Sequence, residues 1–109
     1  MGNSSTLKKT GTSRLEKVIT SKTKDFLEDL KKIDKLWFFK VSDKFTAGVP
    51  DFVGVWRGRF FAIELKREGG KPRLLQALIL SRINKAGGLT LATDDFEDVK
   101  KLFDPVALL

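Results

Sequence analysis

Two carboxylates and one lysine are spaced so that a β-hairpin would bring them onto one face. Arg57-Gly58 separates two apolar, β-rich runs, and a glycine in the second turn position permits the positive φ that a tight hairpin requires. With a two-residue turn, Asp51 lies directly opposite Glu64, and opposed residues share a face with Cβ atoms about 4.5–5.5 Å apart. Lys66 follows Glu64 by two residues, so it lies on the same face.

These three side chains have the chemistry of a site for a hard cation. Opposed like charges destabilise a sheet, and a cation between them removes that penalty. Mg²⁺ prefers one or two carboxylates together with water and phosphate oxygens, and it polarises phosphoryl groups and lowers the pKa of bound water. Lys66 would orient or activate the attacking water, or stabilise the developing negative charge. The alternative is an ordinary surface hairpin. The shared face depends on the register, and a slip of one residue would turn every side chain of one strand to the opposite face.

Helical periodicity predicts a helix in front of the hairpin. Ser13 and Glu16 match a capping box, and apolar residues keep helical spacing from there to about residue 33. The aromatic run over 36–41 predicts a strand. Residues 1–12 are rich in Ser, Thr, Gly and Lys, and we interpret them as a flexible basic arm in front of a domain over 13–109.

The residues after the hairpin predict a helix, a strand and a second helix. Pro72 suits the first turn of a helix that Gly87-Gly88 ends. A short strand over 89–92 follows, and Asp94 caps a last helix. The expected fold is a single-domain α/β protein with an α+β mixed sheet, in the order α-β-β-β-α-β with a C-terminal helix.

Aromatic and apolar residues on the strands predict how the sheet is covered. Both faces of the hairpin are largely apolar, which is typical of strands covered on both sides. Trp37, Phe38 and Phe39 have two interpretations, since exposed aromatic rings stack on nucleobases whereas buried ones fill a core. We expect core packing, because the three residues lie in a β-rich run of a small protein.

The composition limits the chemistry that the chain can perform. The 109 residues contain no His, Cys or Tyr. Catalysis by Ser-His-Asp or Cys-His, an imidazole base and a phosphotyrosyl intermediate are therefore excluded, and the usual ligands of structural zinc are missing. An enzyme of this composition must use carboxylates, Lys, Arg, amides, hydroxyls and a hard metal.

The positive charge favours a polyanionic partner. The chain has 21 basic and 14 acidic side chains, which points most simply to nucleic acid. Residues 52–90 concentrate this charge, with 8 basic and 2 acidic side chains. Our candidates for phosphate contacts are Lys40, Lys44, Arg67, Lys71 and Arg73. No apolar run is long enough to span a membrane and no signal peptide is evident, so we expect no membrane partner and a cytoplasmic location.

The residues at the hairpin resemble a known nuclease signature. The dipeptide PD at 50–51, followed by ELK at 64–66, resembles the PD-(D/E)xK motif. The segments GVPDF, RFFAIELK, GGKPRLLQ and NKAGG resemble the VRR-NUC (virus-type replication-repair nuclease) family within that superfamily. The resemblance covers about residues 13–92 and implies a restriction-endonuclease-like core.

The resemblance also implies metal ligands and a catalytic lysine. Asp51, Glu64 and the main-chain carbonyl of Leu65 would bind Mg²⁺ or Mn²⁺, and Lys66 would be the catalytic lysine. Gln76 would position the water or a phosphate.

Glu16 matches an acidic residue that such nucleases turn toward the metal from their first helix. A glutamate in a capping box is also fully explained by local structure, so both interpretations of Glu16 stay open.

The resulting hypothesis is a metal-dependent DNA endonuclease in which activated water hydrolyses a phosphodiester bond. The resemblance implies homodimers, some of which cut Holliday junctions, and a replication or repair role in a phage, another virus or a mobile element. A viral protein of this kind would work in the host cytoplasm. The apolar tail Val106, Leu108 and Leu109 would join a dimer contact or pack within its own subunit. The alternative is a non-catalytic nucleic-acid-binding domain with a nuclease-like fold, which the intact signature argues against.

Overall fold

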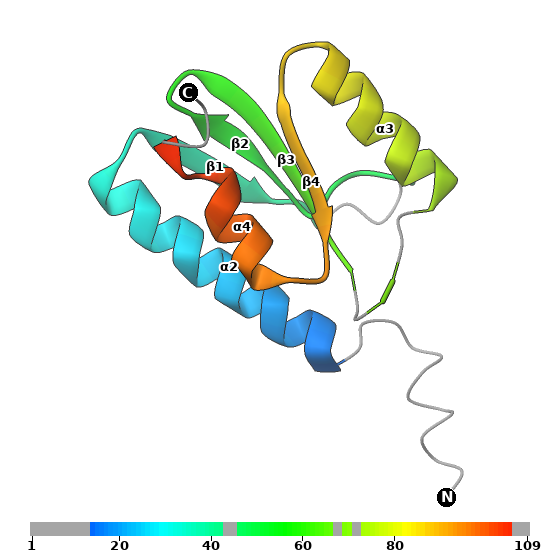
Figure 1. Ribbon diagram of the computed structural model, residues 1–109, viewed down its shortest axis with the longest axis horizontal. Coiled ribbons are helices and arrows are strands. Elements are labelled where there is room, and N and C mark those ends of the chain that lie inside the picture. The colour runs from blue at the N-terminus through cyan, green and yellow to red at the C-terminus, as the bar shows by residue number, and fades with distance from the viewer. Residues whose placement is uncertain (1–13, 43–45, 67–68, 71–72, 106–109) are drawn as a thin grey trace, which may run out of the picture.

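Helices and strands follow one another in the order that the sequence predicts (Figure 1). The computed structural model describes residues 14–42, 46–66, 69–70 and 73–105. Its elements are α2 (Arg14–Ile33), β1 (Leu36–Lys40), β2 (Phe52–Trp56), β3 (Arg59–Leu65), α3 (Leu74–Lys85), β4 (Leu89–Thr93) and α4 (Phe96–Leu102). The predicted N-terminal arm, the Ser13 cap, Pro72 and the apolar C-terminal tail lie outside the described residues.

The strands form one mixed sheet in the order β1-β2-β3-β4. The first three strands are antiparallel neighbours, and β4 runs parallel to β3. A parallel neighbour requires a crossover connection, which α3 provides. The predicted α+β architecture with a mixed sheet is therefore confirmed.

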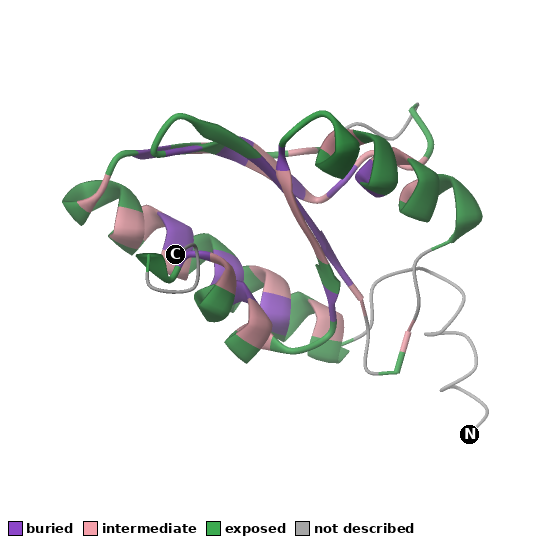
Figure 2. Ribbon diagram, turned by 45° about the horizontal axis from the view of Figure 1, so that its top comes forward, coloured by how far each residue is buried: buried purple, intermediate pink, exposed green. Residues whose placement is uncertain are grey.

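The core lies between the sheet and two helices. Figure 2 shows α2 and α4 together on one side of the sheet and α3 on the other. Phe61 of β3 is fully buried, and its ring centroid lies 4.9 Å from that of Phe103 in an edge-to-face contact. Trp56 contacts the same ring at 5.3 Å. Edge-to-face aromatic pairs add to the stabilisation from apolar burial, so this cluster anchors the hairpin to α4.

A two-residue turn sets the register of the hairpin. Arg57 and Gly58 have φ angles of 51° and 82°, the positive values that a type I′ turn needs, and Trp56 pairs with Arg59. Arg57 is held there by Asp34, whose Oδ2 lies 3.0 Å from Nη2 of the guanidinium. The Arg57 hydrogen bonds lower the pKa of Asp34 to about 2, with help from main-chain and indole donors. The predicted turn is thus confirmed.

One face of the sheet is less covered than the sequence predicts. Trp37 is 59% and Phe39 is 53% exposed, and Val55 and Phe60 of the hairpin are exposed beside them. The prediction that Trp37 and Phe39 belong to the core is wrong, and so is complete cover on both faces. Side chains alternate along a strand, so of these three aromatic residues only Phe38 packs against the core, beside the buried Leu36. Because α3 packs beside β4, it leaves β1 and β2 open on that side.

The cap of the last helix lies one residue later than predicted. Asp95 caps α4, since its Oδ1 accepts a hydrogen bond from the Glu97 amide at 2.9 Å. The Asp94 carboxylate instead accepts a hydrogen bond from the Gly69 amide at 2.7 Å. Both residues are aspartates with suitable spacing, and a tertiary contact decides between them. In the described part of the chain, no helix is both long and apolar enough to cross a membrane.

Candidate active site

The ends of two paired strands position the signature residues. Phe52 pairs with Ile63, so one further step along the ladder brings Asp51 opposite Glu64. The Asp51 carboxylate accepts a hydrogen bond from the Leu65 amide through Oδ2 at 2.7 Å. This bond ties the residue that precedes β2 to the last residue of β3, as the predicted register requires.

A closed hydrogen-bond network joins Glu64, Lys66 and Gln76. Lys66 Nζ lies 3.0 Å from Glu64 Oε2 and donates to Gln76 Oε1 at 2.5 Å. Gln76 Nε2 donates to Glu64 Oε2 at 2.7 Å, and the Arg73 amide donates to Gln76 Oε1 at 3.0 Å. The oxygen of the Gln76 amide thus meets two donors while its nitrogen meets a carboxylate. These contacts fix the orientation of the amide and hold Lys66 against Glu64.

Glu64 is a buried carboxylate whose charged form is disfavoured by its surroundings. It is 4% exposed, and its pKa is raised by burial and then by the negative charge of Asp51, with a smaller effect from Glu16. Hydrogen bonding and charge from Lys66 partly offset this rise. Its second oxygen, Oε1, is buried and meets no hydrogen-bond donor in the described part of the chain. Buried polar atoms without partners are rare, and the position of this oxygen suits it to bind a cation.

Comparisons with known proteins identify the fold around this site. A scan of the sequence against protein-family models finds no match, and neither does a comparison with curated proteins. A search of solved structures finds one described as a "VRR_NUC domain", with a TM-score of 0.66 and 26% sequence identity over 83% of this chain and 95% of that chain. This likeness supports membership of the VRR-NUC family. The predicted resemblance is therefore confirmed.

The donor atoms of this VRR-NUC-like site fit a hard divalent cation. Asp51 Oδ1 and Glu64 Oε1 accept no hydrogen bond from the described residues, while the other oxygen of each carboxylate is engaged. Two carboxylate oxygens are the protein ligands that Mg²⁺ typically takes, with water and phosphate completing its shell. The described residues form no group of three or more acidic side chains that would hold an ion unaided. A cation here would therefore also need main-chain, water or substrate oxygens.

Glu16 lies close to this candidate site but does not form a three-carboxylate cluster with Asp51 and Glu64. Its charge contributes to the raised pKa of Glu64, and it lines the same hollow as Asp51. Glu16 also has an interaction partner of its own. Direct ligation by Glu16 and by the Leu65 carbonyl stay predictions.

The structure describes two of the five basic residues predicted to bind phosphate. Lys40 is exposed at the end of β1 and lines a hollow together with Asp51. Arg73 is exposed at the start of α3, where its main-chain amide orients Gln76. The predicted contacts of Lys44, Arg67 and Lys71 lie outside the described residues.

Two lysines of α2 were not among the sequence-based candidates. Lys17 and Lys24 line the same hollow as Asp51, although they precede it by many residues. They lie seven residues apart, which places them on one face of a helix. That spacing was the available signal.

Proposed function

We propose that this VRR-NUC protein is a Mg²⁺- or Mn²⁺-dependent DNA endonuclease that hydrolyses phosphodiester bonds. The observation that carries the proposal is the state of Glu64. One of its oxygens is held by Lys66 and Gln76, whereas the other is buried without a donor beside Asp51. A carboxylate prepared in this way is suited to a metal ligand, and the lysine beside it is suited to a phosphate.

In this proposal the carboxylates bind the metal and the lysine binds a phosphate. Asp51 and Glu64 would hold the metal through their second oxygens, with the Leu65 carbonyl as a third protein ligand. When bound, Mg²⁺ or Mn²⁺ polarises a phosphoryl group and lowers the pKa of bound water. Lys66 has three N–H donors, of which Glu64 and Gln76 accept two. The third is available to a phosphate oxygen, where it would stabilise developing negative charge. Water would attack the phosphorus directly and displace one bridging oxygen of the strand, so no covalent intermediate is needed.

A cleavage panel tests this proposal. Supercoiled plasmid, linear duplex and a synthetic four-way junction are each incubated with Mg²⁺, Mn²⁺ or EDTA. We expect metal-dependent cleavage that is lost in Glu64→Gln and retained in Glu28→Gln, a surface glutamate that pairs with Lys31. Cleavage in EDTA, or full activity of Glu64→Gln, would exclude the metal mechanism. Binding without cutting under every condition would instead support a non-catalytic nucleic-acid-binding domain.

We further propose that the protein acts as a homodimer on branched DNA. Trp37, Phe39, Val55 and Phe60 form an exposed apolar patch on the open face of the sheet, and contiguous patches of this kind mark contact surfaces. A second copy related by a two-fold axis would cover the patch with the same patch. Two active sites related by that axis suit symmetric cuts in the two strands of a junction.

Oligomeric state and substrate choice test this second proposal. We expect a dimer by sedimentation equilibrium, and a monomer when Phe39→Lys and Val55→Lys are combined. The control is Ile33→Lys, which changes an exposed apolar residue at the far end of α2. A monomeric wild-type protein would contradict the dimer, and equal cleavage of junction and linear duplex would contradict the junction preference.

A further inference from the structure

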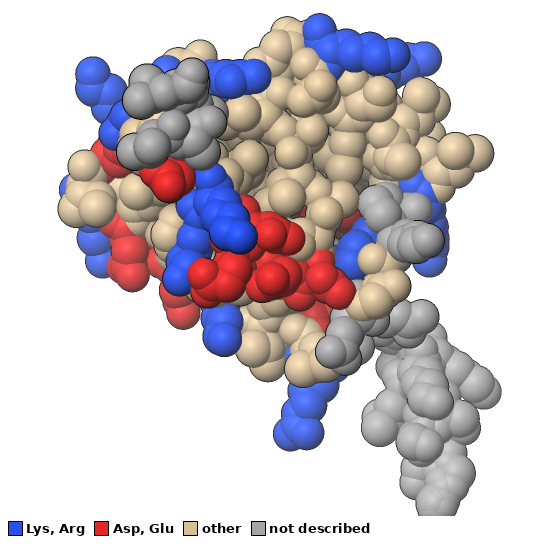
Figure 3. Space-filling view, in the orientation of Figure 1, with Lys and Arg blue, Asp and Glu red and all other residues tan. Residues whose placement is uncertain are grey.

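Two hollows of opposite charge flank the candidate active site. One is lined by three carboxylates, Asp94, Asp95 and Glu97, and by two lysines, Lys22 and Lys66, and Figure 3 shows acidic side chains gathered where β4 leads into α4. The other, of about 400 Å³, is lined by Glu16, Lys17, Thr20, Ser21, Lys24, Lys40 and Asp51. Three of these seven lining residues are lysines and two are carboxylates, which leaves an excess of positive charge. A polyanion is repelled from the first hollow and attracted to the second.

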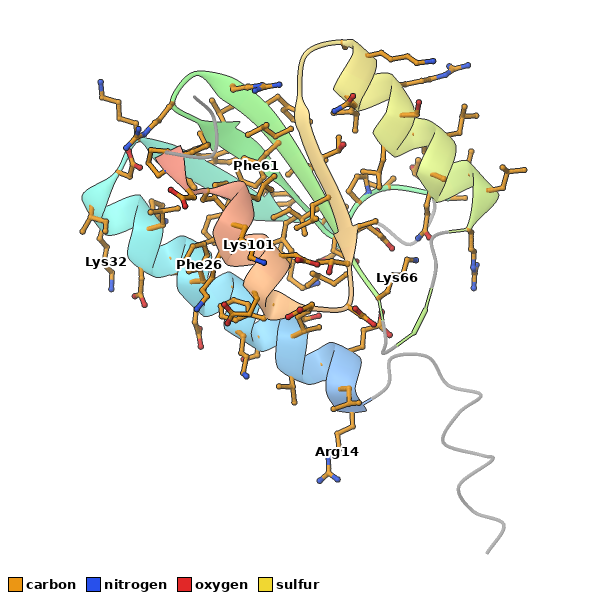
Figure 4. All side chains as sticks on the ribbon, in the orientation of Figure 1. Arg14, Phe26, Lys32, Phe61, Lys66 and Lys101 are labelled. Carbon is orange, nitrogen blue, oxygen red and sulfur yellow. The ribbon has the colours of Figure 1, made fainter. Side chains whose placement is uncertain are left out.

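The lysines of the second hollow differ from those farther along α2. Near the C-terminal end of that helix, Lys31 pairs with Glu28 at 3.1 Å and Lys32 with Asp29 at 3.7 Å. Figure 4 shows Lys32 at the end of α2 remote from Lys66. By contrast, none of the three lysines in the hollow forms a salt bridge with the described residues. Their charge is therefore available to an external anion.

The spacing of these lysines matches a nucleic-acid backbone. Lys17 and Lys24 are separated by seven residues of helix, which is about 10.5 Å at 1.5 Å per residue. Phosphates on one strand advance about 3.4 Å each along a duplex axis, so this span covers about three of them. Ser21 lies between the two lysines on the same helix face and lines the same hollow, where its hydroxyl offers a further donor.

We infer that Lys17, Ser21 and Lys24 of α2, together with Lys40 of β1, bind the phosphate backbone of the substrate strand that leads to Asp51. The inference rests on the proposed function, because it takes nucleic acid as the substrate. It adds the direction of approach: the strand reaches the metal ligands across α2 and β1. The acidic turn between β4 and α4 lies on the other side.

Salt-dependent binding tests the inference without any cleavage. The probe is a fluorescein-labelled 30-base-pair duplex, titrated in EDTA at 50–200 mM NaCl and followed by fluorescence anisotropy. Each phosphate contact contributes about −0.9 to the slope of log K against log salt. Lys17→Ala with Lys24→Ala should make the slope about 1.8 units shallower. Over that fourfold salt range, the variant should lose about 12-fold less affinity than wild type.

The matched control removes the same two charges from the same helix. Lys31→Ala with Lys32→Ala should leave the slope unchanged, and Lys17→Arg with Lys24→Arg should restore it. Equal slopes for wild type and the Lys17/Lys24 alanine variant would overturn the inference, even if the plasmid is still cut in a Glu64-dependent manner. A shallower slope in a protein that cuts nothing would uphold the inference while the proposed nuclease activity failed.

Discussion

Replacing Asp51 with Asn should stabilise the metal-free protein while abolishing its nuclease activity. The negative charge of Asp51 raises the pKa of Glu64, which means that the two carboxylates repel each other in the fold. The carbonyl oxygen of an asparagine can still accept the hydrogen bond that Leu65 donates at 2.7 Å. The substitution therefore removes the repulsion and keeps the contact between the strands.

The size of the effect follows from Coulomb's law. Opposed residues on paired strands have Cβ atoms about 5 Å apart. At that separation, effective dielectric constants of 20 to 80 give a repulsion of about 0.8–3.3 kcal/mol. A gain of 1 kcal/mol raises the melting temperature of a domain of this size by about 4–8 °C. We therefore expect Asp51→Asn to melt roughly 5 °C or more above wild type in EDTA at pH 7.5.

Thermal unfolding with and without metal provides the assay. Asp29→Asn is the control, because that carboxylate pairs with Lys32 on the surface and its loss should change stability by less than about 0.5 kcal/mol. Added Mg²⁺ at ten times its Kd should stabilise wild type by about 1.4 kcal/mol and leave Asp51→Asn unchanged. A lower melting temperature for Asp51→Asn in EDTA would refute the reasoning, since it would mean that the Asp51 charge stabilises the fold.

Three further predictions address the network, the turn and the sheet. Gln76→Leu removes the amide between Lys66 and Glu64, so kcat should fall about 10–100-fold while the Mg²⁺-induced rise in melting temperature persists; an unchanged kcat would contradict this role. Because the pKa of Asp34 falls from 3.8 to about 2 on folding, its stabilisation is present above pH 3.8 and lost as the pH drops toward 2. Asp34→Asn should accordingly lower the melting temperature more at pH 7 than at pH 2. A Cβ at Gly54 would lie 2.2 Å from the Trp37 carbonyl oxygen, so Gly54→Ala should prevent soluble expression. Gly58→Ala meets no neighbouring atom but keeps a φ of 82°, and should cost only about 1 kcal/mol in the free energy of unfolding.

The hairpin and its carboxylates could be predicted because their geometry is local. A glycine in a two-residue turn and the alternation of side chains suffice to bring Asp51 opposite Glu64. The structure keeps that register from Trp56 and Arg59 onward. The hydrogen bonds of Gln76 could not be predicted from local geometry. They join the Arg73 amide at the start of α3 to the Lys66 ammonium after β3, and so depend on how that helix packs.

The cover of the sheet could not be predicted because it depends on where a distant helix packs. Trp37 and Phe39 have the same apolar character as buried strand residues, yet α3 lies beside β4 and leaves them exposed. Likewise, Asp94 and Asp95 are equivalent as caps until the Gly69 amide binds one of them. For one of the unpaired lysines in the hollow beside Asp51, the absence of a salt bridge to the described residues could be predicted from the sequence. Lys17 has no acidic residue three or four positions away, which is the spacing at which helix ion pairs form.

The two-residue turn also determines how this chain can tolerate insertions. Residues added at Arg57-Gly58 lengthen a loop at the end of the hairpin away from the carboxylates, and every strand pair keeps its partner. A single residue added within β2 or β3 would turn all residues beyond it to the opposite face. The number of residues between Asp51 and Glu64 is therefore free to vary through the turn, whereas Glu64 and Lys66 must stay two residues apart. A search pattern for related chains should leave the first interval open and hold the second constant.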